Sequence, residues 1–325
     1  MRGSSVAPTL GGEPVHPRPP TPVDEPAGGP KSDLPARLLT AAVLIPTVLY
    51  VIYLGGLYVL AAVEVLTLLG LRELYRLIEA KGAHPQVTFG LVAGGSLPVI
   101  AYLGGEYHAM LIMTASLLAM MVSQLGKARV GEALASISGT FFGIFYVGWL
   151  LSHAVLLRNF DRVLLGRWPA AAELGLSPHI GAFLLVFTLA SVIACDAGAY
   201  FAGRAYGRRK LAPRISPGKT VEGAVGGVLA GVVAGVLAKL VFDSLWPGVT
   251  RAFPWSAVVP FAFTLAVVGM IGDLVESLLK RDAKRKDTGA LLPGTGGVLD
   301  RIDSNLLAIP VMYYMLLGYF YLRVG

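Results

Sequence analysis

The sequence predicts an all-α membrane protein that crosses the bilayer about nine times. Of its 325 residues, 55% are hydrophobic and only 14% are charged, whereas about 25% of residues are charged in soluble domains. The apolar residues form runs of about 20, the length that a helix needs to span the hydrocarbon core. Charge is scarce along the whole chain, so we expect a polytopic protein rather than a soluble domain with one anchor.

Residues 1–35 are predicted to form a disordered tail in the cytoplasm. Nine of the 21 prolines fall in this segment, together with Gly, Ser and charges of both signs. Such a composition cannot bury enough apolar surface to offset the entropy of ordering. No apolar core closely follows Arg2, so we do not interpret the segment as a signal peptide.

Nine apolar stretches after the tail are predicted to be helices. They cover residues 37–55, 57–75, 87–105, 108–125, 131–156, 180–203, 221–242, 256–279 and 303–323. We assign about five to an N-terminal region, residues 36–179, and about four to a C-terminal catalytic region, residues 180–325. The fifth stretch is long and contains Ser and Gly, so we expect it to be tilted or broken. Residues 158–178 are expected to lie on the membrane surface.

Basic residues indicate which side of the membrane each connection faces. Of the 27 Lys and Arg, 21 fall in the tail, in every second connection or at the adjoining helix ends, and 6 fall elsewhere. Because cytoplasmic segments carry the excess of positive charge, this places the N-terminus in the cytoplasm and the C-terminus outside. Nine spans satisfy that parity, as would seven or eleven. The net charge of +7 favours anionic lipid and phosphate-bearing substrates over nucleic acid as partners.

The helix predicted over residues 221–242 carries a stripe of small residues. Gly223, Gly227, Gly231 and Gly235 recur at every fourth position. This pattern lets helix backbones approach closely in lipid. We interpret it as a packing surface without a catalytic role, and we expect the helix to lie centrally among its neighbours.

The stretch Gly272–Ser304 concentrates charge at the junction of the last two predicted helices. Charged residues are costly at membrane depth and mark functional sites there. Asp273, Glu276, Ser277 and Lys280 are spaced i, i+3, i+4 and i+7. All four share one face if the eighth helix continues through them.

Acidic residues also open the last predicted helix. Asp300 and Asp303 are again spaced i, i+3, and Arg301 lies between them. Asp303 or Ser304 is alternatively an N-cap, because a side-chain oxygen there satisfies a free backbone N–H.

A basic and glycine-rich turn separates these acidic groups. Five of the seven residues 280–286 are Lys or Arg. Ordinary anchoring at the membrane surface explains Lys284 and Arg285 equally well. Gly296 and Gly297 close a Pro-Gly-Thr-Gly-Gly sequence, and such glycines let backbone N–H groups approach an anion.

A second group of polar residues precedes this stretch. Asp196 lies inside the sixth apolar stretch, and the loop after it, residues 204–222, holds six Lys or Arg. Ser216, Lys219 and Thr220 offer the hydroxyl and ammonium donors that a phosphate needs, and Thr220 also suits an N-cap. The spacing of a Walker A loop is absent.

Together these groups predict chemistry on phosphates at the membrane boundary. Carboxylate oxygens suit Mg²⁺, dense Lys and Arg suit a polyphosphate, and the five His are scattered along the chain. We therefore expect phosphoryl or nucleotidyl transfer to a lipid, driven by positioning and charge neutralisation.

The segment Ser277–Asp303 resembles the signature of the bacterial-type phosphatidate cytidylyltransferases, or CDP-diacylglycerol synthases. The matching residues are Ser277, Lys280, Arg281, Lys286, Asp287, Gly289, Leu292, Pro293, Gly296, Gly297, Asp300, Arg301 and Asp303. Upstream matches are Asp196, Gly198, Tyr200, Gly203, Arg204, Ile215, Ser216, Pro217, Lys219, Thr220, Glu222 and Gly223. Thr295 stands where the family has His, and we expect activity to survive because the attacking phosphate is largely ionised.

The resemblance implies that CTP and phosphatidate give CDP-diacylglycerol and pyrophosphate. It implies Mg²⁺, with K⁺ as a second metal, held by Asp273 and Asp300, which act with Lys280 in catalysis. Further metal candidates are Glu276, Asp303 and Asp196. The expected substrate-binding residues are Arg204, Ser216, Lys219, Thr220, Ser277, Arg281, Lys286, Gly296, Gly297 and Arg301. A homodimer in the inner, cytoplasmic membrane, with its site open to cytoplasm and lipid, is also implied.

Three other functions fit parts of the pattern. A CTP-dependent polyprenol or phytol kinase would leave CDP instead of pyrophosphate. An ion-coupled transporter also places carboxylates in helices, but no internal repeat is evident. A non-catalytic binder of phosphorylated lipids would not need the paired acidic residues.

Overall fold

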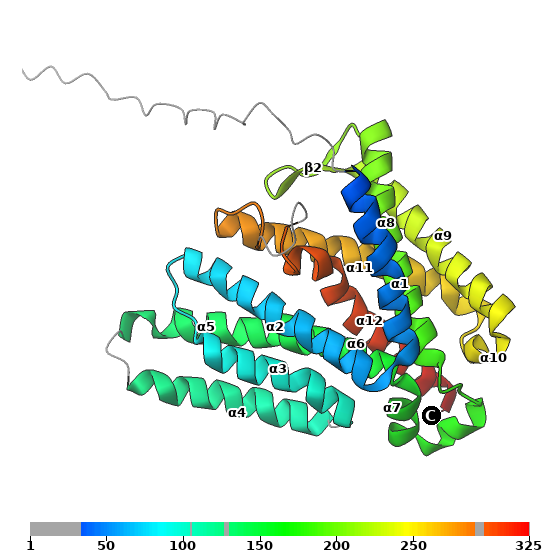
Figure 1. Cartoon of the computed structure of the whole chain (residues 1–325), viewed down its shortest axis with the longest axis horizontal. Coiled ribbons are helices and arrows are strands. Elements are labelled where there is room, and N and C mark those ends of the chain that lie inside the picture. The colour runs from blue at the N-terminus through cyan, green and yellow to red at the C-terminus, as the bar shows by residue number, and fades with distance from the viewer. Residues whose placement is uncertain (1–33, 105, 127–129, 290–295, 325) are drawn as a thin grey trace, which may run out of the picture.

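The computed structural model describes residues 34–104, 106–126, 130–289 and 296–324, and helices account for most of them (Figure 1). Residues 1–33 of the predicted tail lie outside the described residues. Apart from one short hairpin, every regular element in the described ranges is a helix. The predicted all-α fold class is therefore confirmed.

The N-terminal helices follow the predicted ranges closely. They are α1 (Leu34–Leu54), α2 (Gly56–Ala80), α3 (Val87–Leu103), α4 (Glu106–Leu125), η1 (Val130–Glu132), α5 (Ala133–Gly143), η2 (Ile144–Trp149) and α6 (Leu150–Arg158). The π-helical turn η2 joins α5 and α6 into one continuous helix of 26 residues. The expected irregularity of the fifth stretch is this π turn, a feature that often accompanies functional sites.

The C-terminal half contains four long helices with short elements between them. In order they are α7 (Phe160–Arg167), η3 (Pro169–Leu174), α8 (Ile180–Tyr206), β1 (Lys210–Ala212), β2 (Ser216–Thr220), α9 (Val221–Leu245), α10 (Pro247–Thr250), α11 (Trp255–Asp282) and α12 (Leu299–Val324). β1 and β2 form an antiparallel hairpin that pairs Lys210 with Thr220 and Ala212 with Ser216. The sequence reasoning missed this hairpin, since its strands are too short to show alternation.

Six helices in the described part of the chain are long and apolar enough to cross a membrane. They cover residues 107–125, 133–158, 180–206, 221–245, 255–282 and 299–323. The apolar parts of α1 and α3 are shorter, residues 42–54 and 87–103, and α2 carries several charges. The chain is thus a multi-pass membrane protein, whereas nine spans and the side of the N-terminus stay predictions.

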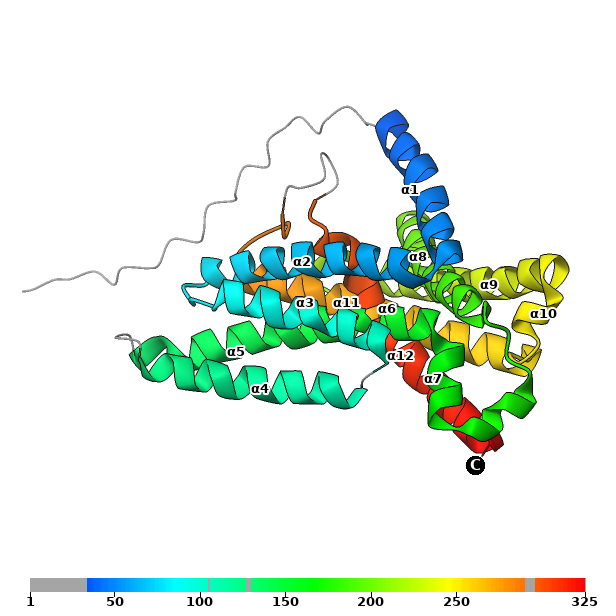
Figure 2. The same ribbon diagram turned by 60° about the horizontal axis from the view of Figure 1, so that its bottom comes forward.

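The main apolar core lies where α2, α6, α8, α11 and α12 meet. Leu74, Leu157, Phe183, Leu265 and Leu306 are buried there. A smaller core packs α3 and α4 against the π turn. In the view of Figure 2, α1 stands out steeply from the other helices and α4 lies along one edge.

The glycine stripe of α9 packs against α8. A methyl group on Gly227 would lie 2.7 Å from the carbonyl oxygen of Cys195, so the backbones are in direct contact. The opposite face exposes Val225, Leu229 and Val233, and α9 lies at the flank of the molecule (Figure 1). The prediction of close packing is confirmed, but the predicted central position is wrong because only one face of α9 is built to receive helices.

Candidate active site at the junction of α11 and α12

The acidic face of α11 is continuous, as its spacing predicted. Because α11 runs to Asp282, the side chains of Asp273, Glu276 and Lys280 lie on one helix. Glu276 is fully buried, and its Oε2 lies 2.5 Å from Nζ of Lys280. The hydroxyl of Ser277 donates a hydrogen bond of 3.4 Å to Oδ1 of Asp273. A fully buried carboxylate in such a helix needs a cation close by, and Lys280 supplies it.

Asp300 occupies the first turn of α12 and faces Lys280. Nζ of Lys280 donates to Oδ1 of Asp300 at 2.9 Å. The backbone N–H groups of Gly297 and Thr288 donate to Oδ2 at 2.7 and 3.2 Å. Hydrogen bonds to an ionised acceptor are stronger than neutral ones, so these donors fix the orientation of the carboxylate.

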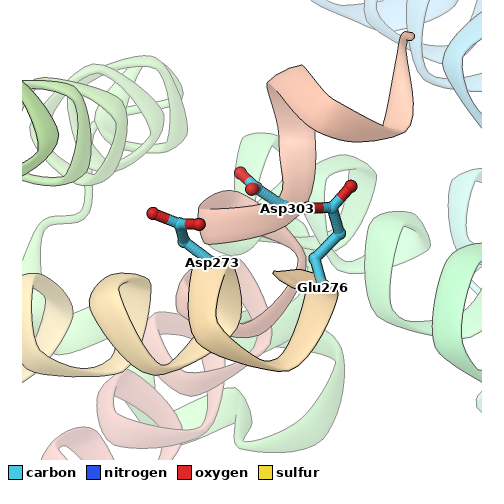
Figure 3. Close-up of side chains that lie close together, drawn as sticks. All are labelled: Asp273, Glu276 and Asp303. Atoms are coloured by element: carbon cyan, nitrogen blue, oxygen red, sulfur yellow. The ribbon is translucent and has the colours of Figure 1, made fainter. Parts of the chain in front are cut away.

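Three carboxylates converge where α11 and α12 approach each other. One oxygen each from Asp273, Glu276 and Asp303 lies within 4.8 Å of the other two, and Figure 3 shows the three side chains gathered between the two helices. Oxygen ligands at this spacing suit a hard divalent cation. Asp273 belongs both to this group and to the metal-binding pair that the resemblance implies. The other member of that pair, Asp300, is not in the group, whereas the further candidates Glu276 and Asp303 are.

The start of α12 differs from the predicted one. The helix begins at Leu299 instead of residue 303. Asp303 and Ser304 therefore lie inside the helix, and the alternative that either is its N-cap is wrong. The Ser304 hydroxyl instead donates to Oδ2 of Asp196 at 3.1 Å, which joins α12 to α8.

The hairpin after α8 reaches the same region. Nζ of Lys219 lies 2.5 Å from Oδ2 of Asp273, and Nε of Arg281 donates to the carbonyl oxygen of Ile215 at 3.3 Å. Thr220 is the N-cap of α9, as predicted, because its hydroxyl accepts the N–H of Gly223 at 3.1 Å. The two polar segments of the sequence therefore meet.

A pocket of about 510 Å³ lies between α8, the hairpin, α9 and α11. This volume is in the range of small-molecule sites, about 300–1,000 Å³. The predicted residues that line it are Asp196, Arg204, Ser216, Lys219, Thr220 and Asp273. Arg204 is exposed and donates to the hydroxyl of Tyr200 at 3.3 Å. The pocket lining therefore combines cationic and hydroxyl donors with carboxylates.

The remaining predicted site residues do not line this pocket. Lys286 and Arg301 are exposed to solvent. Gly296 has a φ of 85°, which favours glycine, and a side chain there would press on Asp300. Leu292, Pro293 and Thr295 lie outside the described residues.

Glu73 of α2 belongs to this junction, although the sequence reasoning missed it. Only 3% of this residue is exposed. Its carboxylate accepts hydrogen bonds from N–H of Val298 at 3.0 Å, N–H of Leu299 at 2.8 Å and the Thr288 hydroxyl at 3.2 Å. The available signal was its place on the apolar face of α2, three residues after Gly70, because a carboxylate on a buried face needs a polar partner.

Comparisons with known proteins agree with the motifs. Residues 35–319 match the model of the Cytidylyltransferase family. The chain belongs to this family. Because the match extends from α1 to the last turns of α12, it covers the N-terminal helices of this chain as well as the motif-bearing half.

Three curated relatives match more than half of this chain. A phosphatidate cytidylyltransferase of Synechocystis sp. is 33% identical over 296 residues, which cover 86% of this chain and 94% of that protein. One of Pseudomonas aeruginosa is 34% identical over 290 residues, or 87% and 97% of the two chains. One of Bacillus subtilis is 35% identical over 193 residues, or 55% and 69%.

Proposed function

We propose that this protein is a phosphatidate cytidylyltransferase, which converts CTP and phosphatidate into CDP-diacylglycerol and pyrophosphate. A phosphate oxygen of phosphatidate attacks the α-phosphorus of CTP, and the bond from that phosphorus to the oxygen bridging to the β-phosphate breaks. The observation that carries the proposal is the meeting of Lys219 and Lys280 with four carboxylates beside one pocket, in a chain of the Cytidylyltransferase family. Relatives named for this activity match nearly their whole length.

The basic side chains are assigned to neutralising the negative charge of the phosphates. Phosphoryl and nucleotidyl transfer needs reacting groups in line and negative charge balanced at the phosphates. We assign this balance to Lys280 and Arg281 on α11. Lys219, Ser216 and Arg204, which line the pocket, hold the triphosphate or the lipid phosphate.

The carboxylates fit a divalent cation. Asp273, Glu276 and Asp303 gather three acceptor oxygens within 4.8 Å, and the ammonium groups next to them are those of Lys219 and Lys280. We propose Mg²⁺, with K⁺ as a second ion, held by Asp273 and Asp300 with Glu276, Asp303 and Asp196 as further ligands. When bound, Mg²⁺ would offset charge on the phosphate oxygens during transfer.

The proposed setting is the inner, cytoplasmic membrane, with the pocket facing the cytoplasm. The distribution of 21 against 6 basic residues supports this orientation. We also propose a homodimer, with CTP, phosphatidate and membrane lipids as partners and no nucleic acid.

Product analysis tests the proposed function directly. Detergent-purified protein, incubated with CTP, phosphatidate and Mg²⁺, is expected to form CDP-diacylglycerol and pyrophosphate by mass spectrometry, and none with EDTA. CDP with a phosphorylated lipid would indicate a kinase, and substrate flux into proteoliposomes without CTP would indicate a transporter. Either result would contradict the proposal.

Two substitutions test the site. Asp273→Asn and Asp300→Asn should each lower turnover about 100-fold or more, because each removes a carboxylate charge that we assign to holding the cation. Asp282→Asn is the matched control, since Asp282 ends the same helix and pairs with Lys81 away from the carboxylate group. Full activity in both site variants would show that the assignment of the site is wrong.

A further inference from the structure

Glu73 is a buried carboxylate that the proposed mechanism does not use. It lies in α2, more than 200 residues before the segment that it contacts. Burying an ionised carboxylate is unfavourable unless hydrogen bonds compensate for the lost water. Its partners therefore indicate what the residue does.

The first two partners are backbone amides at the start of α12. The first N–H groups of a helix have no acceptor within the helix, and that end of the helix attracts negative charge. Oε1 of Glu73 accepts from Val298, and Oε2 accepts from Leu299. α12 is thus capped by a side chain from another helix.

The groups that contact Glu73 also hold Asp300. Thr288 donates its hydroxyl to Glu73 and its N–H to Asp300. Gly297 donates its N–H to Asp300, and the next residue, Val298, donates to Glu73. The two carboxylates are therefore joined by two short bridges, one through Thr288 and one through residues 297–298.

Glycines make this close approach sterically feasible. A side chain at Gly289 or at Gly297 would collide with the carboxylate of Glu73. Both glycines match the family signature. Their place beside Glu73 gives a physical reason for glycine at these two positions, whose φ values lie outside the left-handed region.

We infer that Glu73 is a positioning residue that sets the orientation of the Asp300 carboxylate toward Lys280. It acts through Thr288 and the turn at residues 297–299, and it contacts neither substrate nor the reacting phosphates. The kinetic part of this inference rests on the proposed cytidylyltransferase activity. The structural part concerns only the hydrogen bonds at the start of α12.

Glu73→Gln tests the inference with little change of shape. The side-chain oxygen of Gln can replace one carboxylate oxygen. The NH₂ group takes the place of the other, and it cannot accept a hydrogen bond from the backbone N–H that it faces. We expect kcat to fall about tenfold or more and KM for CTP to change less than about threefold, because positioning acts on the transition state. Glu73→Asp keeps the charge and should recover part of kcat.

Hydrogen exchange gives a readout that does not depend on turnover. In Glu73→Gln, at least one of the amides of Val298 and Leu299 should exchange about tenfold faster or more than in the wild type, since Gln offers an acceptor oxygen to only one of them. Amides in α8 and α9 should keep their wild-type rates. Glu79→Gln is the matched control, because Glu79 is an exposed carboxylate on the same helix, and it should change neither readout.

The outcomes separate this inference from the proposed function. A wild-type protein that makes no CDP-diacylglycerol defeats the proposed function, and exchange at Val298 and Leu299 still decides the role of Glu73. Unchanged exchange there in Glu73→Gln overturns the inference. Normal turnover per folded molecule, with only a lower melting temperature, also overturns it. If Glu73→Gln does not fold, the same two measurements on Glu73→Asp decide.

Discussion

The junctions α8–α9 and α11–α12 hold the same number of basic residues but organise them differently. Segments 204–219 and 280–301 each contain six Lys or Arg. The α8–α9 junction is closed by contacts within about 20 residues of sequence: the hairpin, the Thr220 cap, and backbone N–H groups of Arg208 and Arg209 that donate to Glu222. Five of its six basic residues are exposed, as are five of the six at the α11–α12 junction.

The α11–α12 junction depends on buried charge and on a distant helix. Lys280 lies between Glu276 and Asp300, with 16% of its side chain exposed, and Glu73 holds the start of α12 from α2. Charge that is exposed remains available for a ligand, whereas buried charge must be balanced within the protein. The comparison indicates that both junctions expose basic charge that a ligand can use, and that the second also contains a buried group around Lys280 and Glu276 that fixes geometry.

Removal of Lys280 should give the largest loss of stability and turnover. A harmless substitution would contradict the view that the α11–α12 junction depends on buried charge. Lys280→Met leaves the buried Glu276 and the partly buried Asp300 without their ammonium partner. Breaking a buried ion pair at one partner typically costs about 3–5 kcal/mol, so a large drop in thermal unfolding temperature in detergent and loss of turnover are expected.

The double variant Lys280→Met with Glu276→Gln separates stability from catalysis. It removes the uncompensated charge of Glu276, so most of the stability should return. Turnover should stay absent, because Lys280 is assigned to the phosphates. A double variant as unstable as the single one would show that Lys280 does not compensate Glu276.

Substitution of Gly289 should give an intermediate effect. In Gly289→Ala, the new methyl group meets the Glu73 carboxylate, and overpacking of this kind costs about 1–3 kcal/mol. The control at the other junction is Gly218→Ala, because no heavy atom lies within 4 Å of a side chain built there. Unfolding temperatures are measured by differential scanning fluorimetry. Equal values for the two variants would show that Gly289 is no more sterically restricted than Gly218.

Loss of the α9 cap should give the smallest effect. Thr220→Ala deletes the hydroxyl that accepts the N–H of Gly223, and an N-cap contributes about 1 kcal/mol. Thr220→Ser keeps that oxygen and should unfold at nearly the wild-type temperature. A loss as large as that of Lys280→Met would mean that the first junction is as tightly balanced as the second.

Local patterns made much of this structure predictable. The nine apolar stretches each coincide with a long helix, and the spacing of Asp273, Glu276 and Lys280 places them on one helix as expected. These features depend on residues within one or two turns of each other, so the helical period is enough to predict them. The signature that resembles the family also identified the correct family.

Features that depend on distant contacts escaped prediction. Glu73 gives no local sign of its role, because its partners lie more than 200 residues away and two of them are backbone amides. The apolar run predicts a start for α12 at residue 303, four residues later than the structure shows. Acceptors for the amides of Val298 and Leu299 come from another helix, so the true start at Leu299 has no capping signal in its own sequence.

The contact between α8 and α9 has a mechanical consequence. Methyl groups at Gly223, Gly227 or Gly231 would press on carbonyl oxygens of α8, so the two helices cannot slide past each other or tilt independently without separating their backbones. We therefore expect α8 and α9, which line the pocket, to move together. We expect any widening that admits a two-tailed lipid to come from displacement of α11 or of the hairpin.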